Sequence, residues 1–428
     1  MKGTLGITAC VAALMAATAA NAQELVIWHD KGDDGLAMIE EMSALFEAQH
    51  PGVTVTSLSY PTEQWFNRSI AGLNTNTGPD ILFNDNNRIA TIQQSTGRLC
   101  SVGDLVDGLP EGDRAYITDG DIAAATLEGD IIMMPFQRVV IGWGARQSWL
   151  DAVGEEYPET WDDMIRVAQL FQDTDPDGNG EDDTFGVALQ AGSAPSMIGA
   201  GTRMFAIAGN GVPYDIMNTD AEIVITDPAV ADPTIGILQL FTEHGLVSPD
   251  TVNHNFTDMY QLIEGGRVGF FRVGNWNVAK WDREALEGDY VVGPYPSHIE
   301  GQPGHMLVNT VRGMAVPCDG DNVDLAREFV SFIVSQEAQQ ASLDHMGGVV
   351  RDDLDISGVT PGLTAFVSGE YPMATDSFMA SIHPWYPELE EAYYRHLIDA
   401  VSNPPEDWDA WLQATAEDLQ NTVAELQN

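Results

Sequence analysis

The amino-acid sequence predicts an α/β fold, because short apolar runs that read as strands alternate with helical apolar patterns. Residues 25–28 form the first run, and apolar residues then recur at helical spacing from 36 to 46 until Pro51 and Gly52 end the pattern. A second run at 53–56, a second helical pattern and a third run at 81–83 follow. This strand–helix–strand order is typical of a parallel sheet covered by helices.

The alternation continues to the C-terminus, and 428 residues suffice for about two or three domains. Further strands are expected near 131–143, 223–225, 268–273 and 308–316. Further helices are expected near 161–172, 234–244, 324–340, 388–401 and 407–426. Neither an internal repeat at solenoid period nor a low-complexity segment interrupts this pattern.

The charge of the chain excludes several classes of partner. The sequence holds 18 basic and 65 acidic side chains, a formal charge of −47, while 44% of the residues are apolar and can form cores. Such a negative field repels phosphate backbones and anionic lipid, so we expect no nucleic-acid partner. After the N-terminus, no stretch approaches the roughly 18 uncharged apolar residues that span a bilayer. The acidity also suggests, as a hypothesis, a salt-rich habitat.

The N-terminus predicts a signal peptide at residues 1–22. A short basic start precedes an apolar, alanine-rich stretch from 5 to 20, and Ala20 and Ala22 form a small-x-small pattern before Gln23. The alternative is a lipoprotein, since residues 7–10 have the order of a lipobox, although too few residues precede Cys10 for the usual apolar region. The sequence therefore predicts an exported protein, periplasmic where the cell has an outer membrane.

Two cysteines, Cys100 and Cys318, remain after cleavage. An oxidising compartment permits a disulfide, but two cysteines are not a disulfide framework. The alternative is a pair of buried thiols that behave as small apolar side chains. The sequence leaves open whether the two residues pair.

No motif of a catalytic site stands out. The chain lacks a Gly-x-Ser-x-Gly elbow, a His-Glu-x-x-His helix and a Walker loop, and its histidines lack metal-ligand spacing. With 65 acids, carboxylate pairs of the glycosidase kind arise by chance. The sequence therefore favours a protein that is not an enzyme and needs no cofactor for chemistry.

Six segments, in one order along nearly the whole chain, have counterparts in a known family. They are 25–36 (LVIWHDKGDDGL), 46–55 (FEAQHPGVTV), 78–83 (GPDILF) with the loop to 88, 265–276 (GGRVGFFRVGNW), 312–317 (RGMAVP) and 384–389 (PWYPEL). The second is similar to the step F-E-x-x-x-P-G-V-x-V, and the fourth to G-x-x-A-M-x-x-x-G-x-W. The chain thus resembles the family 1 extracellular solute-binding proteins, the maltose-binding-protein-like receptors of ABC sugar importers.

The resemblance implies a two-lobed periplasmic-binding-protein fold. Each lobe is expected to be a mixed, mainly parallel sheet flanked by helices, with a ligand cleft between the lobes. The first lobe would comprise 23–136 and 305–342, and the second 137–304 and 343–428. Such a receptor is expected to act as a monomer, to close over its ligand by hinge motion and to deliver it to the membrane permease subunits of an ABC importer.

A sugar offers apolar C–H faces and a rim of hydroxyls, so its site needs aromatic platforms and polar groups that donate and accept. The resemblance places such a platform at Trp276, after a strand and a Gly–Asn turn, where the family's tryptophan stacks on sugar. Without the resemblance, an aromatic residue after a strand is more often part of the core.

The resemblance also implies polar ligand contacts on two loops. Asp30 and Lys31 follow the first strand, where the maltose-binding protein places an Asp–Lys pair on its ligand. Asn84, Asn87 and Arg88 follow the third strand, and the two asparagines depart from the aromatic and acidic residues of the maltose receptor, which puts maltose itself in doubt. The alternatives are a solvated lysine and ordinary turn chemistry.

Two further candidates come from the same resemblance. Tyr393 aligns with an aromatic sugar platform on a C-terminal helix, although its neighbours leave open which ring faces the ligand; these are Trp385, Tyr386 and Tyr394. Gln137 falls where the chain crosses between the lobes.

Residues 175–183 resemble the first part of an EF-hand-type calcium loop. Gly180 stands at position 6, but the bidentate Glu of position 12 is replaced by Gly186. The expected ligands of a structural calcium ion are the side chains of Asp175, Asp177, Asn179 and Asp183 and the carbonyl of Glu181. The alternative is a solvated, acidic turn.

The leading hypothesis is a substrate-binding protein that captures a carbohydrate and hands it to an ABC importer. One alternative is a secreted glycan hydrolase, and another is a receptor for a non-sugar solute such as a glycerol phosphodiester. A phosphate would need converging cations, which the few basic residues disfavour. The identity, linkage and length of the sugar cannot be read from the sequence.

Overall fold

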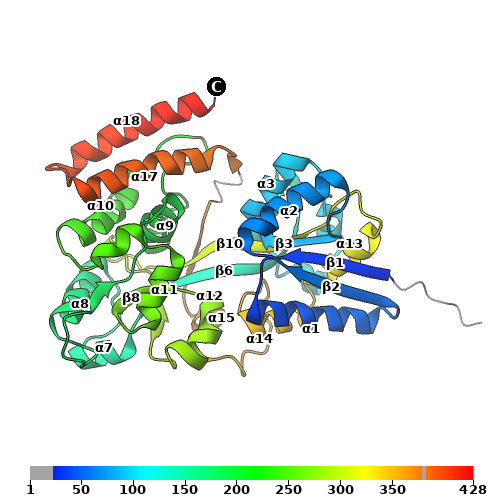
Figure 1. Ribbon diagram of the computed structural model, residues 1–428, viewed down its shortest axis with the longest axis horizontal. Coiled ribbons are helices and arrows are strands. Elements are labelled where there is room, and N and C mark those ends of the chain that lie inside the picture. The colour runs from blue at the N-terminus through cyan, green and yellow to red at the C-terminus, as the bar shows by residue number, and fades with distance from the viewer. Residues whose placement is uncertain (1–22, 378–381, 428) are drawn as a thin grey trace, which may run out of the picture.

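The computed structural model describes residues 23–377 and 382–427, apart from the side chains at 62, 63 and 200. The predicted signal peptide and the lipobox cysteine Cys10 lie outside the described residues. Two α/β bodies lie side by side and are joined by two long strands (Figure 1). We call the body that carries β1–β3 the first lobe and the body that carries β7 and β8 the second lobe. Within the described residues, no helix is long and apolar enough to cross a membrane.

The strands are β1 (Gln23–His29), β2 (Val53–Ser59), β3 (Ile81–Asp85), β4 (Thr126–Leu127), β5 (Asp130–Ile131), β6 (Met134–Ala145), β7 (Phe185–Val187), β8 (Val268–Gly274), β9 (Val291–Gly293), β10 (Met306–Ala315) and β11 (Met373–Thr375). The helices of the N-terminal half are α1 (Asp33–Gln49), α2 (Thr62–Thr75), α3 (Asn86–Thr96), α4 (Gly103–Gly108), α5 (Glu111–Arg114), α6 (Asp119–Ala125), α7 (Gln147–Val153), α8 (Trp161–Asp173), α9 (Ala194–Met197), η1 (Ile198–Thr202) and η2 (Phe205–Gly209). Those of the C-terminal half are α10 (Pro228–Thr242), η3 (Pro249–Asn253), α11 (Phe256–Glu264), α12 (Asn275–Lys280), η4 (Trp281–Ala285), α13 (Val323–Phe332), α14 (Gln336–Met346), α15 (Pro361–Val367), α17 (Tyr386–Ser402) and α18 (Trp408–Leu426).

The expected α/β alternation is present, with two differences: the helix expected near 324–340 is divided into α13 and α14, and one expected strand is missing. The apolar run near 223–225 does not form a strand and makes only an isolated bridge, between Met217 and Ile223. The run is cut short because Asp227 caps the next helix, accepting a hydrogen bond from the backbone N–H of Ala229.

The main sheet is mixed, with the strand order β2-β1-β3-β10-β6-β8-β7. In the first lobe, β1 lies parallel to β2 and to β3. In the second lobe, β7 lies parallel to β8. The carboxyl ends of these parallel strands are where polar loops emerge, which places the candidate site residues of each lobe at one edge of its part of the sheet.

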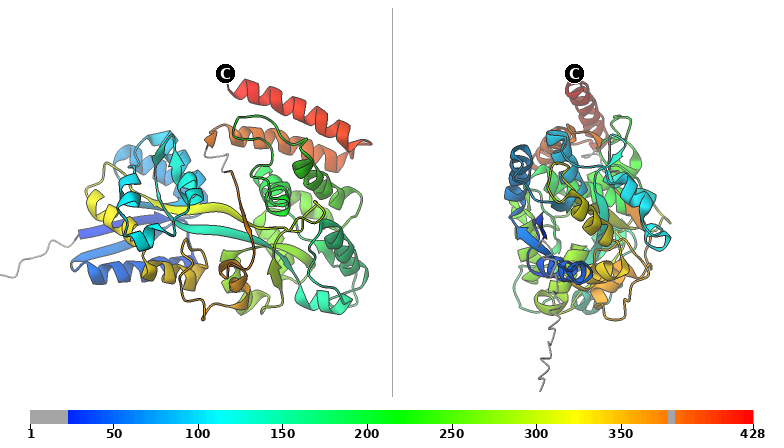
Figure 2. Two further views of the ribbon diagram at one scale, coloured as in Figure 1. Left: turned by 180° about the vertical axis from the view of Figure 1, so that it is seen from behind. Right: turned by 90° about the vertical axis from the view of Figure 1, so that its right-hand side faces the viewer.

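Strands β6 and β10 carry the chain between the lobes as an antiparallel pair, visible from behind in Figure 2. One end of β10 pairs with β3, while the distal half of β6 pairs with β8 and β9. The predicted exchange points 136/137 and 304/305 fall inside β6 and just before β10. The predicted point 342/343 falls inside α14, a single helix, so an exchange there would come after Met346.

The cores explain why the apolar periodicity produced these elements. In the first lobe, α1, α13 and α14 bury their apolar stripes against β1, β3 and β6, with Phe46, Phe83 and Phe136 fully buried. In the second lobe, Trp143 and Phe205 meet edge to face with ring centroids 5.0 Å apart. Burial of each such side chain stabilises the fold by about 1.5–3 kcal/mol.

His29, the last residue of β1, is a polar residue in the core of the first lobe and is fully buried. Its Nδ1 accepts a hydrogen bond from the backbone N–H of Lys31 at 3.1 Å. Burial, together with the neighbouring Lys31 ammonium, lowers the pKa of His29 to about 4. The imidazole is therefore neutral at physiological pH.

The cysteines that the sequence left open are paired: Cys100 and Cys318 form a disulfide across a sequence separation of 218 residues, with their Cα atoms 5.0 Å apart. Two backbone hydrogen bonds flank the bridge, from Cys100 N to Val316 O at 2.8 Å and from Cys318 N to Arg98 O at 2.9 Å. The bridge thus joins the segment after α3 to the end of β10.

Replacing both cysteines, as Cys100→Ser with Cys318→Ser, should lower the free energy of unfolding by about 2–5 kcal/mol, because the unfolded chain regains the freedom that the bridge removes. Urea unfolding under oxidising conditions measures this loss. A reductant should destabilise the wild type and leave the double variant unchanged; equal midpoints for the two proteins would contradict the prediction.

Acid should destabilise the protein through His29. Its contribution is complete above about pH 6.5, where neither state is protonated, and declines as the pH falls toward 4, because only the unfolded chain takes up the proton. The loss over this window is about 3 kcal/mol. In urea unfolding between pH 7 and 4, the wild type should lose stability faster than His29→Asn, which keeps an acceptor for Lys31; parallel curves would refute this.

Candidate ligand-binding site

The Asp30–Lys31 pair lies directly after β1. Lys31 Nζ donates a hydrogen bond to Asp30 Oδ1 at 2.5 Å, and both side chains are less than a tenth exposed. The ammonium lies 5.4 Å from the centre of the Phe83 ring. Lys31 is therefore not the solvated surface lysine of the alternative interpretation, and burial lowers its pKa.

The carboxylate of Asp30 stays ionised in this buried setting. Burial alone would raise the pKa of Asp30, but the Lys31 ammonium and the other neighbouring polar groups together hold the pKa below its usual value. The Arg312 guanidinium and the side-chain amide of Asn84 act in the same direction. The structure thus brings Asp30, Lys31 and Asn84 together at the carboxyl ends of β1 and β3.

The polar residues at the end of β3 and the start of α3 have different environments. Arg312 Nε, on β10, donates to Asp85 Oδ1 at 2.8 Å. Asn87 and Arg88 lie in the first turn of α3, where Asn87 is exposed and its Oδ1 accepts a hydrogen bond from the backbone N–H of Arg88 at 2.8 Å. Asn87 therefore makes the local turn contact that the alternative interpretation expects, while its exposed amide nitrogen stays accessible.

Trp276 lies in the first turn of α12, directly after β8, and is partly exposed. Its ring packs closely against Gly274: a Cβ at that glycine would come within 2.3 Å of the ring. The side chain of Arg272 also contacts this ring, and its guanidinium carbon is 5.3 Å from the centre of the Trp276 ring. Phe256, which is 40% exposed, lies on the same guanidinium at 4.7 Å.

Three residues at this end of the second lobe were missed by the sequence reasoning: Phe256, Arg272 and Gln190. Gln190 follows β7 and is 2% exposed, and both its amide atoms are buried without a hydrogen-bond partner among the described residues. In the sequence, Arg272 itself could have indicated a functional position, because it is a charged residue in the otherwise apolar run of β8 and buried strands rarely carry a charged residue.

The junction between the lobes holds Asn275 and Gln137. Asn275 Nδ2 donates to Arg138 O at 3.1 Å and to Gly347 O at 3.4 Å, so α12 is tied to β6 and to the end of α14. Gln137 is 1% exposed, and its Nε2 donates to Ser342 Oγ at 2.7 Å. Gln137 thus links β6 to α14, and its Nε2 also donates to Met38 Sδ at 3.2 Å.

The ring of Tyr393 is buried and does not face the solvent. Tyr393 is 1% exposed in the core between α17 and α10, where its hydroxyl donates to Thr234 Oγ1 at 3.3 Å. Tyr386 is equally buried, and its hydroxyl donates to Asp215 Oδ1 at 2.8 Å. Of the four neighbouring aromatics, Trp385 and Tyr394 remain partly exposed, and the Tyr394 hydroxyl donates to the carbonyl of Ala191, the residue after Gln190.

Carboxylates of the 175–183 loop gather around the side chain of Asn179. Its Nδ2 donates to Asp177 Oδ2 at 2.9 Å and to Asp183 Oδ1 at 3.2 Å. Asp175 accepts from the backbone N–H of Gly180 at 3.0 Å through Oδ2, while its Oδ1 is buried without a partner. Burial and the neighbouring carboxylates raise the pKa of Asp177.

This loop fits a calcium ion only in part. Gly186, at the position of the missing bidentate Glu, lies in β7, where a Cβ would come within 2.8 Å of Ala168 and so leaves no room for a ligand. Among the described residues, no group of three or more His, Cys, Asp or Glu side chains is arranged to hold a metal ion.

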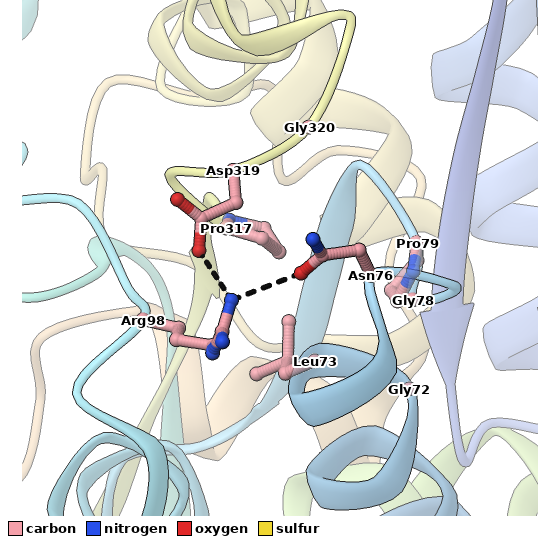
Figure 3. A pocket seen from close by; sticks show the side chains of 9 residues that line it. All are labelled: Gly72, Leu73, Asn76, Gly78, Pro79, Arg98, Pro317, Asp319 and Gly320. Carbon is pink, nitrogen blue, oxygen red and sulfur yellow. Dashed lines mark hydrogen bonds and ion pairs between the residues drawn. The ribbon is translucent and has the colours of Figure 1, made fainter.

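A small pocket at the opposite end of β3 is too small to be the ligand site (Figure 3). Its volume is about 50 Å³, far below the roughly 300–1,000 Å³ of typical ligand pockets. The Arg98 guanidinium in it already donates to Asp319 Oδ2 at 2.6 Å and to Asn76 Oδ1 at 2.9 Å.

Curated relatives match parts of the chain. The lactose-binding protein of Rhizobium radiobacter is 29% identical over 178 residues, which is 40% of this chain and 40% of that protein. The fructooligosaccharide ABC transporter substrate-binding protein FusA of Streptococcus pneumoniae is 23% identical over 299 residues, 60% of this chain and 52% of that protein. The matched part thus spans about half or less of the length of these relatives.

Solved structures match nearly the whole chain. The GacH receptor of Streptomyces glaucescens, solved without ligand and with acarbose, superposes with a TM-score of 0.74 at 16% identity, covering 94% of this chain and 99% of that one. The sugar-binding protein MalE of Xanthomonas citri superposes with a TM-score of 0.73 at 14% identity, covering 94% and 98%. These likenesses confirm the predicted two-lobed α/β fold. The sequence model of the family described as "Bacterial extracellular solute-binding protein" matches residues 29–340, more than half of the chain, and the chain therefore belongs to this family.

Proposed function

We propose that the protein captures a carbohydrate between its lobes and delivers it to the permease subunits of an ABC importer. The observation that carries the proposal is the partly exposed Trp276 ring, packed closely against Gly274 at the carboxyl end of β8. An aromatic face in this place suits the apolar C–H face of a sugar ring. The family of the chain, and the sugars named for its relatives, support the same reading.

Polar groups on both lobes would complete such a site. Asp30, Lys31 and Asn84 offer an acceptor and donors on the first lobe, and Gln190 offers both on the second. Export, a periplasmic location after removal of residues 1–22 and action as a monomer belong to this proposal.

A receptor is a better match to these groups than a glycan hydrolase. A glycosidase needs one carboxyl group that is protonated to donate a proton and a second one nearby. Asp30 is held ionised by Lys31, and Asp85 is paired with Arg312. Product release, followed together with tryptophan fluorescence across an oligosaccharide panel, tests this choice: saturable quenching without product supports the receptor.

Replacement of the platform, Trp276→Ala, should weaken sugar binding about 10- to 100-fold while the fold is retained, because the stacked apolar contact is lost. Isothermal titration with a sugar found in a thermal-shift screen measures the change. Trp411→Ala, a partly exposed tryptophan on α18, is the matched control and should bind as the wild type does. An unchanged affinity of Trp276→Ala would remove this residue from the site.

We also propose that the 175–183 loop binds a structural calcium ion. Asp175, Asp177, Asn179 and Asp183 would hold it with side-chain oxygens and Glu181 with its carbonyl. The buried, unpartnered Oδ1 of Asp175 and the two carboxylates, those of Asp177 and Asp183, that accept hydrogen bonds from Asn179 support the proposal. Bound calcium would neutralise the negative charge of these carboxylates and would hold the loop between α8 and β7 in one conformation.

Calcium added to chelator-stripped protein should release or take up heat and raise the melting temperature, since an ion that binds only the folded state stabilises it by about 2.7 kcal/mol at 100 times Kd. Asp177→Asn together with Asp183→Asn should abolish both effects. Asp352→Asn, outside the loop, should retain both. If the wild type shows neither heat of binding nor a change in melting temperature, the calcium proposal is wrong. The receptor proposal does not depend on this result.

A further inference from the structure

Arg272 is a buried cation without an anionic partner among the described residues. The residue is 4% exposed, in the middle of the buried strand β8. Its guanidinium lies over the rings of both Phe256 and Trp276. In the part of the chain that the structure describes, no carboxylate or other hydrogen-bond acceptor meets this guanidinium, and its Nε is buried without a partner.

Other arginines buried to a similar degree are all paired with acids. Arg351 forms ion pairs with two carboxylates, those of Asp113 and Asp353. Arg146 lies 3.5 Å from a carboxylate oxygen of Asp289. In a chain with 65 acidic side chains, the lack of an acid beside Arg272 is a property of this position rather than of the composition.

A buried charge without a partner is costly, so it is retained where a later partner compensates it. The ring faces of Phe256 and Trp276 attract the cation, but such contacts do not use its N–H donors. These donors therefore remain available for a group that arrives with the ligand. An incoming carboxylate would accept two parallel hydrogen bonds from the planar guanidinium, the geometry in which arginine pairs most strongly.

Arg272 lies next to Trp276, so its N–H donors are close to the ring on which the sugar is proposed to stack. Arg272 contacts the same Trp276 ring on which the sugar is proposed to stack. The helix that carries Trp276, α12, lies where the second lobe meets the first, and its Asn275 bonds the carbonyl of Gly347 (Figure 1). Gln190, at the carboxyl end of the neighbouring strand β7, adds an amide whose donor and acceptor are both unused.

We infer that the carbohydrate taken up is an acidic sugar, a uronic acid or an oligosaccharide containing one, whose carboxylate is bound by Arg272 while its ring stacks on Trp276. The inference rests on the proposed receptor function and specifies its substrate class. A carboxylate fits better than a phosphate, because a phosphate carries nearly two charges. Two cations of the first lobe near its candidate site, Lys31 and Arg312, are already paired with Asp30 and Asp85.

The experiment compares three forms of one sugar by isothermal titration at neutral pH. The forms are the uronate, its neutral parent sugar and its methyl ester, each as a monosaccharide and a disaccharide, in the galacturonate and glucuronate series. The wild type should bind the uronate at least about tenfold more tightly than the parent or the ester, which has the same shape but no charge. A sugar phosphate of the same series is the fourth ligand.

The variant Arg272→Gln should weaken uronate binding about 10- to 100-fold and change binding of the neutral parent less than about threefold, because only the charge-assisted hydrogen bonds are lost. Arg272→Lys keeps the charge without the planar fork and should be intermediate. Arg166→Gln, a surface arginine paired with Glu155, is the matched control and should behave as the wild type.

Equal or tighter binding of the neutral parent, the ester or the sugar phosphate by the wild type would overturn the inference, as would an unchanged uronate affinity in Arg272→Gln. If that variant fails to fold by circular dichroism, the wild-type ranking of the ligands decides alone. Binding of neutral sugars without uronates would refute only the acidic-sugar inference. Binding of no sugar at all would refute the inference and the proposed receptor function together.

Discussion

The antiparallel pairing of β6 with β10 is the constraint on which the rest of the structure depends. These two strands cross between the lobes and together join the two parts of the sheet: β10 is hydrogen-bonded to β3 in the first lobe, and β6 to β8 in the second. Because strand registers propagate across a sheet, the pair sets where β3 and β8 end. The pair therefore positions Asn84, near the end of β3, and Trp276, after β8.

The charges of the candidate site are arranged unevenly between the lobes. On the first lobe, every buried charge that faces the loops has a protein partner, as Lys31 has Asp30 and Arg312 has Asp85. On the second lobe, Arg272 has aromatic rings instead of an acid. Low dielectric surroundings strengthen any pairing made there and make an unpaired charge expensive. The first lobe therefore offers a pre-organised polar surface, and the second offers an unused cation beside an apolar platform.

Local pattern predicted more of the fold than of the site. Helical and strand periodicity depends on neighbouring residues, so α1, β2, α8 and the C-terminal helices could be read directly. The site residues that lay in motifs, such as Trp276, Asp30 and Lys31, could be named by resemblance. Arg272 and Gln190 could not, since their meaning depends on which side chains of other elements approach them. Tyr393 shows the converse: the same helix periodicity is satisfied whether a ring faces solvent or packs against α10.

The sequence by itself determined the α/β class, the order of the elements, the acidic surface and the motifs that assign the chain to its family, because these depend on composition and on short-range spacing. Only the tertiary structure decided that Cys100 and Cys318 pair across 218 residues, that Lys31 is buried against Asp30, and that no acid of residues 23–377 or 382–427 lies beside Arg272. Pairing, burial and the lack of a partner depend on the three-dimensional arrangement of the side chains. They arise where segments far apart in the chain are brought together by the sheet.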